Sequence, residues 1–321
     1  MTMKKIIILL LPLFILSCSS DNNSPSEPEN VEGSILKSYK ENNPNGNIHL
    51  FENKGSRYEK IVFPTGEILI KFAYDSNNKM TKSTVSPDSY PATTTFTYNN
   101  DGQIIKMEKD NRNPGTAGKL FVWLFSYNNN VVTGELVSDQ DPNFNHVKVQ
   151  YTFNNEGLLI SKHDYADYPA KENRPIRTNS YISLKYDNNK NIVLLKMTKN
   201  GTHDLPDSPA NLYVYSTTYE YDDKPNPVHQ IYMNHYMNYI LSNEYPFVLE
   251  RGSIQDIVTG TGTNNLIKTT YSTDENGGIP VDNIYKNIYS YQLNNLPSKM
   301  ARISTVDNKE DSGLIFNYSD K

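Results

Sequence analysis

Apolar and polar residues alternate with a period of two along most of the chain, which predicts strands. One parity is rich in aromatic and aliphatic residues: Tyr127, Phe125, Trp123 and Phe121, then Tyr186, Leu184 and Ile182, and also Tyr221, Tyr219, Tyr215 and Tyr213. The other parity is polar: Thr97 and Thr95, then Thr152, Gln150 and Lys148, and also Glu220, Thr218 and Ser216. The pattern therefore predicts an antiparallel sheet with one apolar face and one polar face.

A short motif recurs along these strands, with two aromatic or apolar residues at alternate positions and then Asn or Asp. The copies are Phe72, Tyr74 and Asp75; Phe96, Tyr98 and Asn99; Phe125, Tyr127 and Asn128; Tyr151, Phe153 and Asn154; Leu184, Tyr186 and Asp187; Tyr219, Tyr221 and Asp222; Tyr289, Tyr291 and Gln292; and Phe316 with Tyr318. Successive copies lie about 25 to 35 residues apart as far as Tyr221, which is typical of repeat proteins. Each unit is long enough for one β-hairpin.

Tight turns are expected directly after these motifs. Asn99 to Gly102 and Asn154 to Gly157 form four-residue turns in which glycine takes a positive φ. After the turns, Ile105 with Met107 and Val193 with Leu195 are expected to resume the apolar face.

The fold class that follows is all-β, a large antiparallel meander of hairpin repeats. A sheet with one apolar face needs a cover, and few segments of this chain have helical spacing. Curling into a barrel or half-barrel buries that face and removes exposed edges. A two-sheet β-sandwich is the alternative.

One segment, 227–242, departs from the strand pattern. Val228, Ile231, Tyr232, Tyr236 and Tyr239 follow helical spacing after two prolines. The segment predicts one short amphipathic helix that plugs the end of a barrel. Its two histidines, His229 and His235, are expected to be ordinary half-buried side chains and not metal ligands, because a spacing of six places them on different helix faces.

Cys18 is the single cysteine, and it follows a start that is typical of a signal peptide. Lys4 and Lys5 precede a short apolar run, and small Ser17 precedes the thiol. The segment resembles the lipobox of bacterial lipoproteins, which implies lipidation of Cys18 and attachment to a membrane. We therefore expect a signal peptide at 1–17, a lipidated and flexible tether at 18–33, and a single β domain at 34–321.

Composition narrows the classes of partner and function. The net charge of −5 becomes −7 when Lys4 and Lys5 are removed with the signal peptide, and this acidity argues against nucleic acid as a partner. A disulfide within the chain is excluded because there is one cysteine. Tyrosine is abundant, with 24 residues, and it favours strands while carrying a polar hydroxyl.

The repeats resemble the tyrosine-aspartate repeats of Rhs-type and teneurin-type shells. Together with the lipobox and the segment Tyr219 to Pro227, they are similar to a family of Bacteroidota surface lipoproteins with a porin-like β fold and no established activity. The resemblance implies a fold and a location at the outer membrane. It supplies no catalytic residues.

Motifs for catalysis or cofactor binding do not occur in the sequence, so no enzyme activity, cofactor or metal site is expected. His163 with Asp164 and His203 with Asp204 are neighbours that point to opposite faces of a strand. Asp139 to Asn143 and Asp187 to Asn191 have calcium-like spacing, but they lack the required Gly and Glu and are interpreted as turns. Gly260 to Gly262 is also interpreted as a turn.

A glycan or an apolar molecule is the expected ligand, contacted by loop aromatics. The candidate contact residues lie in segments that are predicted to be exposed loops: Tyr90, Phe144, Tyr165 and Tyr168. Tyr165 and Tyr168 belong to a predicted loop at 165–178. Trp123 is assigned to the core because both faces of its strand are largely apolar.

Two functional hypotheses follow. The first is a lipid-anchored, non-catalytic binding or envelope-assembly module at the outer membrane or cell surface. The alternative is a membrane-embedded barrel that forms a pore, or, less favoured, a glycan-active enzyme. The direction of the apolar face separates the first two, because a pore places that face toward lipid and a water-exposed barrel places it inside.

Overall fold

The computed structural model is an all-β protein that closes into an antiparallel barrel. It describes residues 35–41, 48–54, 57–85, 91–110, 120–137, 145–171, 174–202, 211–242, 260–275, 281–306 and 310–319. The strands are β1 (Ile35–Glu41), β2 (Ile48–Lys54), β3 (Arg57–Val62), β4 (Ile68–Tyr74), β5 (Met80–Val85), β6 (Ala92–Tyr98), β7 (Ile104–Asp110), β8 (Leu120–Asn128), β9 (Val131–Leu136), β10 (Asn145–Phe153), β11 (Leu159–Lys171), β12 (Arg174–Tyr186), β13 (Ile192–Thr202), β14 (Asn211–Pro225), β15 (Asn264–Glu275), β16 (Val281–Tyr291), β17 (Pro297–Ser304) and β18 (Glu310–Ser319).

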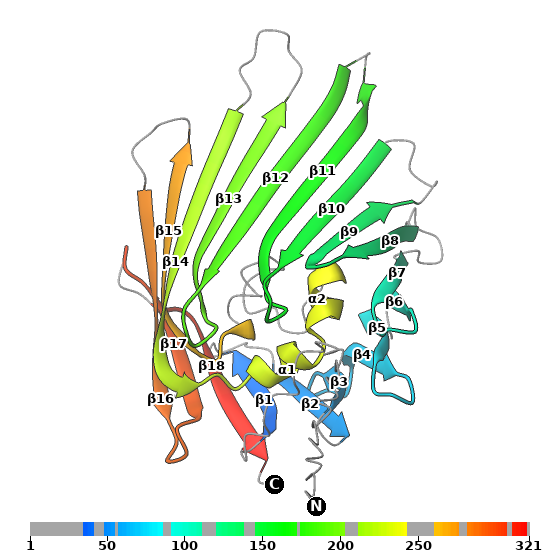
Figure 1. The fold of residues 1–321 in the computed structure, drawn as a ribbon. Coiled ribbons are helices and arrows are strands. Elements are labelled where there is room, and N and C mark those ends of the chain that lie inside the picture. The colour runs from blue at the N-terminus through cyan, green and yellow to red at the C-terminus, as the bar shows by residue number, and fades with distance from the viewer. Residues whose placement is uncertain are drawn as a thin grey trace, which may run out of the picture.

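Each strand pairs with its neighbour in sequence, and β1 pairs with β18 to close the barrel (Figure 1). The predicted barrel is therefore confirmed, and the sandwich alternative is wrong. Closure pairs the backbone groups of both terminal strands, which would otherwise be sticky edges. Because the number of described strands is even, β1 begins and β18 ends at the same end of the barrel.

The apolar parity faces inward, as the hypothesis of a water-exposed barrel requires. Phe125, Tyr151, Leu184 and Tyr219 are each between 3% and 6% exposed and belong to one core cluster. Trp123 is partly buried against that cluster, which confirms its assignment to the core.

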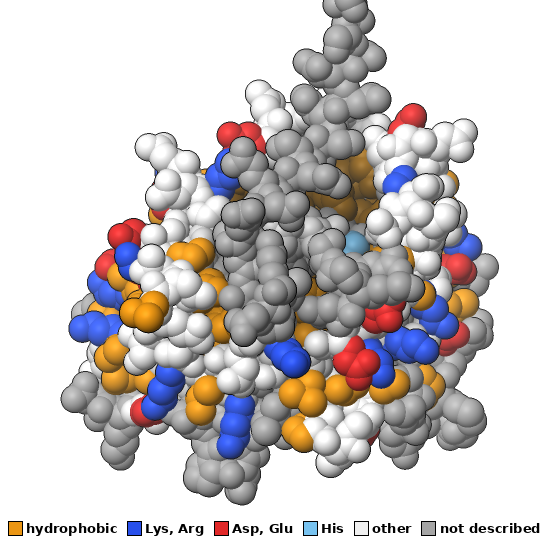
Figure 2. Space-filling model, turned by 90° about the horizontal axis from the view of Figure 1, so that it is seen from below, with side chains coloured by type: hydrophobic (Ala, Val, Ile, Leu, Met, Phe, Trp, Pro, Cys, Tyr) orange, Lys and Arg blue, Asp and Glu red, His pale blue; other side chains and the backbone are white. Residues whose placement is uncertain are grey.

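The polar parity faces outward and carries cross-strand ion pairs. Lysine and glutamate side chains pair at 2.8 Å between Lys60 and Glu52, at 2.6 Å between Lys148 and Glu135, and at 2.6 Å between Lys268 and Glu220. Figure 2 shows charged side chains spread around the rim of the barrel end where the termini lie. Exposed apolar side chains, Leu124, Tyr181 and Ile288, lie among these charges on the outward parity, so the outer face is mixed and contains many charges.

The motif turns share one geometry. In the turns that begin at Asp75, Asn99, Asn154, Asp187 and Gln292, the first N–H donates to the fifth carbonyl oxygen. The fourth residue has a positive φ, which is 80° at Gly102 and 78° at Gly157, as predicted. Where the first residue is Asp or Asn, its side-chain oxygen also accepts the fifth N–H. This Asx contact explains why the motif ends in Asp or Asn.

Each of these turns is followed by a β-bulge, which the sequence did not reveal. The pairing moves from Tyr98–Ile104 to Thr97–Lys106, so that Ile105 is skipped, and Val193 is skipped in the same way. The prediction is wrong for these two residues, since Ile105 is 37% exposed whereas Ile104 is buried, and it is confirmed for Met107 and Leu195, which are each 3% exposed. A bulge reverses the parity of the residues that follow it.

The segment expected to be helical contains two consecutive short helices inside the barrel, α1 (His229–Asn234) and α2 (Tyr236–Ser242) (Figure 1). They are separated at His235, whose φ of −135° and ψ of 34° leave the helical region. Buried Ile231, Tyr232 and Ile240 join the core cluster of the strands. We call 226–242 the plug.

The loop expected at 165–178 is instead the extended far end of β11 and β12. Both strands are 13 residues long and remain paired as far as Lys171 and Arg174. The charged and proline-containing sequence looked like a loop, but cross-strand pairing prevails over these local preferences.

Candidate functional site

The end of the barrel where β1 begins and β18 ends is lined by a ring of inward-facing tyrosines. Their hydroxyls donate to backbone carbonyl oxygens of preceding strands: Tyr58 to Leu36, Tyr74 to Tyr58, Tyr98 to Met80, Tyr127 to Ile104, Tyr186 to Leu159, Tyr221 to Ile192 and Tyr318 to Pro297. The distances are 2.5 to 3.4 Å. These seven residues are the tyrosine ring. Their bonds explain why most copies of the motif have tyrosine at the second position, although one copy has Phe153 there.

Burial keeps the tyrosine ring in its protonated, donating form. It raises the pKa of Tyr127 to about 12, and it also raises the pKa values of Tyr98 and Tyr221. A buried phenolate would lose its hydration, so the neutral form is favoured. The ring therefore acts as a structural element and not as a set of acid–base catalysts.

The plug binds directly to this ring and the adjacent strands. The amide of Asn238 donates to the hydroxyl of Tyr98 at 2.9 Å, and the N–H of Leu159 donates to the hydroxyl of Tyr236 at 2.9 Å. Burial raises the pKa of Tyr236 to about 12. These contacts join the plug to β6 and β11, on separate parts of the wall.

A glycine allows the plug to pack closely. A Cβ atom on Gly260 would lie 2.4 Å from the ring of Tyr232, which is 1% exposed. Nearby, Nδ1 of His229 lies 2.8 Å from the carbonyl oxygen of Thr261, and the amide of Asn226 donates to Gly262 at 2.8 Å. Gly260 to Gly262 thus holds the plug in place. It includes the end of a helical turn, which corrects its interpretation as a plain turn.

Asp222 organises the strand that leads into the plug. One carboxylate oxygen accepts the N–H groups of Lys224 at 2.9 Å and Asn265 at 3.1 Å. The other oxygen accepts the hydroxyl of Tyr291. The charge therefore has several donors and serves the structure.

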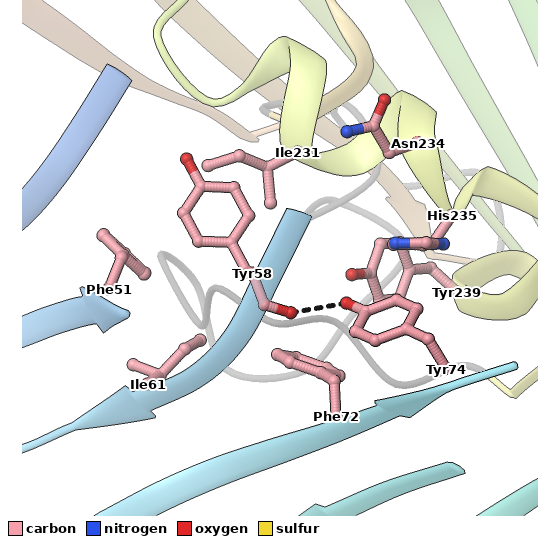
Figure 3. A pocket seen from close by; sticks show the side chains of 9 residues that line it. All are labelled: Phe51, Tyr58, Ile61, Phe72, Tyr74, Ile231, Asn234, His235 and Tyr239. Atoms are coloured by element: carbon pink, nitrogen blue, oxygen red, sulfur yellow. Dashed lines mark hydrogen bonds between the residues drawn. The ribbon is translucent and has the colours of Figure 1, made fainter. Parts of the chain in front are cut away.

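A small cavity lies between the plug and the strands (Figure 3). Its lining comprises Phe51, Tyr58, Ile61, Phe72 and Tyr74 from the wall, and Ile231, Asn234, His235 and Tyr239 from the plug. The cavity volume of about 10 Å³ is enough for one water molecule at most. Burial lowers the pKa of His235 to about 4. The lining contains no carboxylate that could pair with a charged histidine, so the imidazole stays neutral.

Beyond the plug, the inward face becomes partly exposed and polar. We call this surface the distal wall: Lys162 and Asp164 of β11, Met197 of β13, Tyr215 of β14, Tyr271 of β15, Tyr285 of β16 and Arg302 of β17. Strand register places each of them opposite another inward-facing residue, such as Tyr151 opposite Lys162 and Thr217 opposite Tyr271. Each is partly exposed, unlike the core residues beside the plug.

Two cations of the distal wall contact aromatic rings. The guanidinium of Arg302 lies 4.3 Å from the ring centre of Tyr285. The ammonium of Lys162 lies 5.9 Å from the ring centre of Tyr151 and 3.0 Å from a carboxylate oxygen of Asp164. The rings of Tyr271 and Tyr285 meet edge to face at 5.8 Å. Cations, aromatic rings and hydroxyls are thus presented together on one concave face.

Bulges explain why the sequence did not reveal this wall. Ile160 and Ser298 are skipped in their hairpins, so Lys162 and Arg302 point inward although unbroken alternation would place them outside. The spacing after a motif turn was the available signal, because the turns that begin at Asp75, Asn99, Asn154, Asp187 and Gln292 all carry this bulge.

Two of the four predicted contact aromatics lie in the described part of the chain, both in β11. Tyr90 and Phe144 lie outside the described residues, as does Cys18. Tyr165 lies within β11 and not in a loop, opposite outward-facing Lys148. Tyr168 also lies in β11, opposite Ile176, and its side chain is outside the described part. The loop assignment of these two residues is therefore wrong.

The adjacent His and Asp of β11 do point to opposite faces. His163 packs against Tyr181 at 6.1 Å on the outer surface, whereas Asp164 pairs with Lys162 inside. His203 and Asp204 are outside the described residues.

Asp187 to Asn191 forms a turn, as interpreted from the sequence. The Asp187 carboxylate accepts the N–H groups of Asn189 and Asn191, each at 2.9 Å. Asp139 to Asn143 lies outside the described residues. In the described part of the chain, no three His, Cys, Asp or Glu side chains are grouped to hold a metal ion. No helix among the described residues is long and apolar enough to cross a membrane.

Comparisons with known proteins give fold similarity at low identity. No protein-family model matches the sequence, and no curated protein matches it either. A porin-like protein from Bacteroides vulgatus is 11% identical with a TM-score of 0.42, over 90% of this chain and 100% of that one. A porin-like protein from Bacteroides uniformis is 9% identical with a TM-score of 0.28, over 74% and 95%. The Photorhabdus luminescens Tc holotoxin pore is 13% identical with a TM-score of 0.34, over 85% of this chain and 14% of that one. Such values carry no information about function.

Proposed function

We propose that this protein is a lipid-anchored, non-catalytic binding module at the outer membrane or cell surface, with its barrel in water and a ligand held in the lumen. The observation that carries the proposal is the direction of the two sheet faces. The apolar face is inside and packs on the plug, whereas the outer face carries ion pairs such as Lys148–Glu135 and Lys268–Glu220.

A membrane-embedded pore is disfavoured by the same observation. Barrels that span a bilayer present a continuous apolar band to lipid, and charged residues there destabilise them by about 2 to 4 kcal/mol each at the midplane. The plug also fills one end of the lumen with buried side chains, including Tyr232 and Ile240. Both features favour a barrel that binds over one that conducts.

A non-catalytic role is supported by the character of the titratable groups. The buried tyrosines have raised pKa values and donate to the backbone. Asp222 is held by several donors. In both arrangements the titratable group is already bonded within the structure. His235 lies beside a cavity, but that cavity holds one water at most, so a substrate does not fit next to it.

Attachment to a membrane is proposed from Cys18 and from the position of the termini. β1 begins at the plugged end, so a lipid on Cys18 would place that end toward the membrane and the distal wall away from it. The distal wall would then be on the side from which a ligand arrives.

Labelling and solubility test the proposal. A clickable fatty acid should label the wild-type protein in cells and not Cys18→Ser, because the thiol is the acceptor. A chain that starts at Val31 should be monomeric without detergent, as judged by sedimentation. Equal labelling of both proteins would remove the anchor from the proposal, and a detergent requirement would favour the pore.

A further inference from the structure

The wall around Arg302 combines the three kinds of group that recognise an acidic sugar. We propose that Arg302, Tyr285 and Tyr271 form a binding site in the lumen for a carboxylate-bearing saccharide. This rests on the proposed function, in which the lumen holds the ligand, and it adds the chemical class of that ligand.

The cation is presented in a geometry suited to a carboxylate. The guanidinium lies 4.3 Å from the ring centre of Tyr285, and stacking of this kind uses the flat face of the group. Nε of Arg302 is buried, so the terminal N–H groups of the guanidinium are those that a carboxylate can reach. Met300 pairs with buried Leu314, so its side chain faces the lumen. Arg302 lies two residues further along the same strand and therefore points to the same side.

The rings supply an apolar surface beside this charge. Tyr271 and Tyr285 lie on adjacent strands with ring centres 5.8 Å apart at 84°. Edge-to-face rings form a corner, and the C–H face of a pyranose packs on such aromatic surfaces as apolar area. Both residues are only partly buried, whereas Tyr219, on the inward face of β14 next to the plug, is 5% exposed.

Hydroxyl and amide groups surround the corner. Register places Thr217 opposite Tyr271, Thr269 opposite Tyr285, and both Asn287 and Ser312 opposite Arg302. Thr217 and Thr269 are themselves buried, and the amide of Asn287 donates to the carbonyl oxygen of Leu266 at 2.8 Å. These three groups therefore complete the wall beneath the site, and Ser312 is the exposed one. The preference for an acidic sugar over a neutral one rests on Arg302, and the preference for a sugar over a simple anion rests on the two tyrosine rings.

Positive and negative groups share the lumen near this site. Lys162 is paired with the carboxylate of Asp164 at 3.0 Å, and register places Lys109 on the inward face of β7, opposite Phe121. On the outer surface, Lys268 is paired with Glu220. Arg302, which lies against the ring of Tyr285, is therefore the cation on which the proposal rests.

Titration calorimetry on the full-length protein tests the inference, with trigalacturonic acid as the acidic probe and maltotriose as the neutral one. We expect measurable binding of trigalacturonic acid that weakens with salt, and at least tenfold weaker binding of maltotriose. Arg302→Gln should weaken binding of the acidic probe at least tenfold, and Arg302→Lys should weaken it because the flat fork is lost. Lys268→Gln, on the outer surface, should change it less than twofold.

Tyr271→Leu provides a second variant that leaves the charge in place, and it should weaken binding of both sugars. The inference is overturned if trigalacturonic acid does not bind, if both sugars bind equally, or if Arg302→Gln and Tyr271→Leu bind as the wild type does. None of these results would alter fatty-acid labelling of Cys18 or detergent-free behaviour. Failure of this inference is therefore distinguishable from failure of the proposed function.

Discussion

The two halves of the lumen belong to one barrel but differ in what their inward side chains do. Next to the plug, Phe125 and Leu184 are about 6% and 5% exposed, and the tyrosine ring gives its hydroxyls to the backbone. On the distal wall, Lys162 and Arg302 are partly exposed and lie on aromatic rings. Stability is thus concentrated at the motif end, which leaves the far half able to carry polar groups that a packed core would exclude.

The largest expected difference between the halves comes from removing a core ring. Phe125→Ala should lower the free energy of unfolding by about 3 to 5 kcal/mol, because a buried phenyl leaves a cavity that the wall cannot fill. Thr97→Ala, on the exposed outer parity, should change it by less than about 0.5 kcal/mol. Chemical denaturation of both variants is the measurement. Similar small changes in the two would contradict the one-sided sheet.

The plugged half should also weaken in mild acid. Burial lowers the pKa of His235 to about 4, and burial lowers that of His229 as well. An unfolded histidine titrates near about 6.5, so between the two values the unfolded chain binds more protons. Stability is fully present above pH about 6.5 and decreases as the pH falls toward 4, by up to about 3 kcal/mol for His235.

The contribution of His235 is measured from the denaturation midpoints of the wild type and His235→Gln at pH 7 and pH 5. All other titrating groups are present in both proteins, so the difference between the two reports on His235. The stability lost between these pH values should be smaller in His235→Gln. An unchanged pH dependence in His235→Gln would show that the histidine is not buried in this way.

Removing a tyrosine hydroxyl should cost more stability in the tyrosine ring than on the distal wall. Tyr98→Phe removes a hydroxyl that donates to Met80 and accepts from buried Asn238, and it should cost about 1 to 2 kcal/mol. Tyr285→Phe keeps its contacts with Tyr271 and Arg302 through the ring, so it should cost less than about 0.5 kcal/mol. Thermal melts of the two variants give the comparison. A larger loss of stability in Tyr285→Phe than in Tyr98→Phe would contradict this difference between the two halves.

The smallest effect is expected on the outer surface. Glu135→Gln breaks the 2.6 Å ion pair with Lys148, in which both side chains are about half exposed. Exposed pairs of this kind contribute about 0 to 1 kcal/mol, and this contribution should vanish in 1 M salt. A loss of several kcal/mol would mean that the outer face is not in water, which would bring the pore back into consideration.

The sequence by itself determined the all-β class, the one apolar face and the turns, because each depends on local chemistry. Alternation sets the face, and Asp or Asn followed by a residue that tolerates positive φ sets the turn. The helical spacing of Val228, Ile231 and Tyr232 likewise revealed the plug. These signals lie within a few residues of one another, so they can be read without knowing the pairing.

Only the tertiary structure decided which charges enter the lumen and how the barrel is held closed. The bulges at Ile160 and Ser298 reverse strand parity, and a reversal by one residue moves Lys162 and Arg302 from the outside to the inside. The bonds of the tyrosine ring join residues 16 to 29 positions apart. Local sequence specifies neither, because a bulge and a cross-strand hydrogen bond are stabilised by partners that only folding brings together.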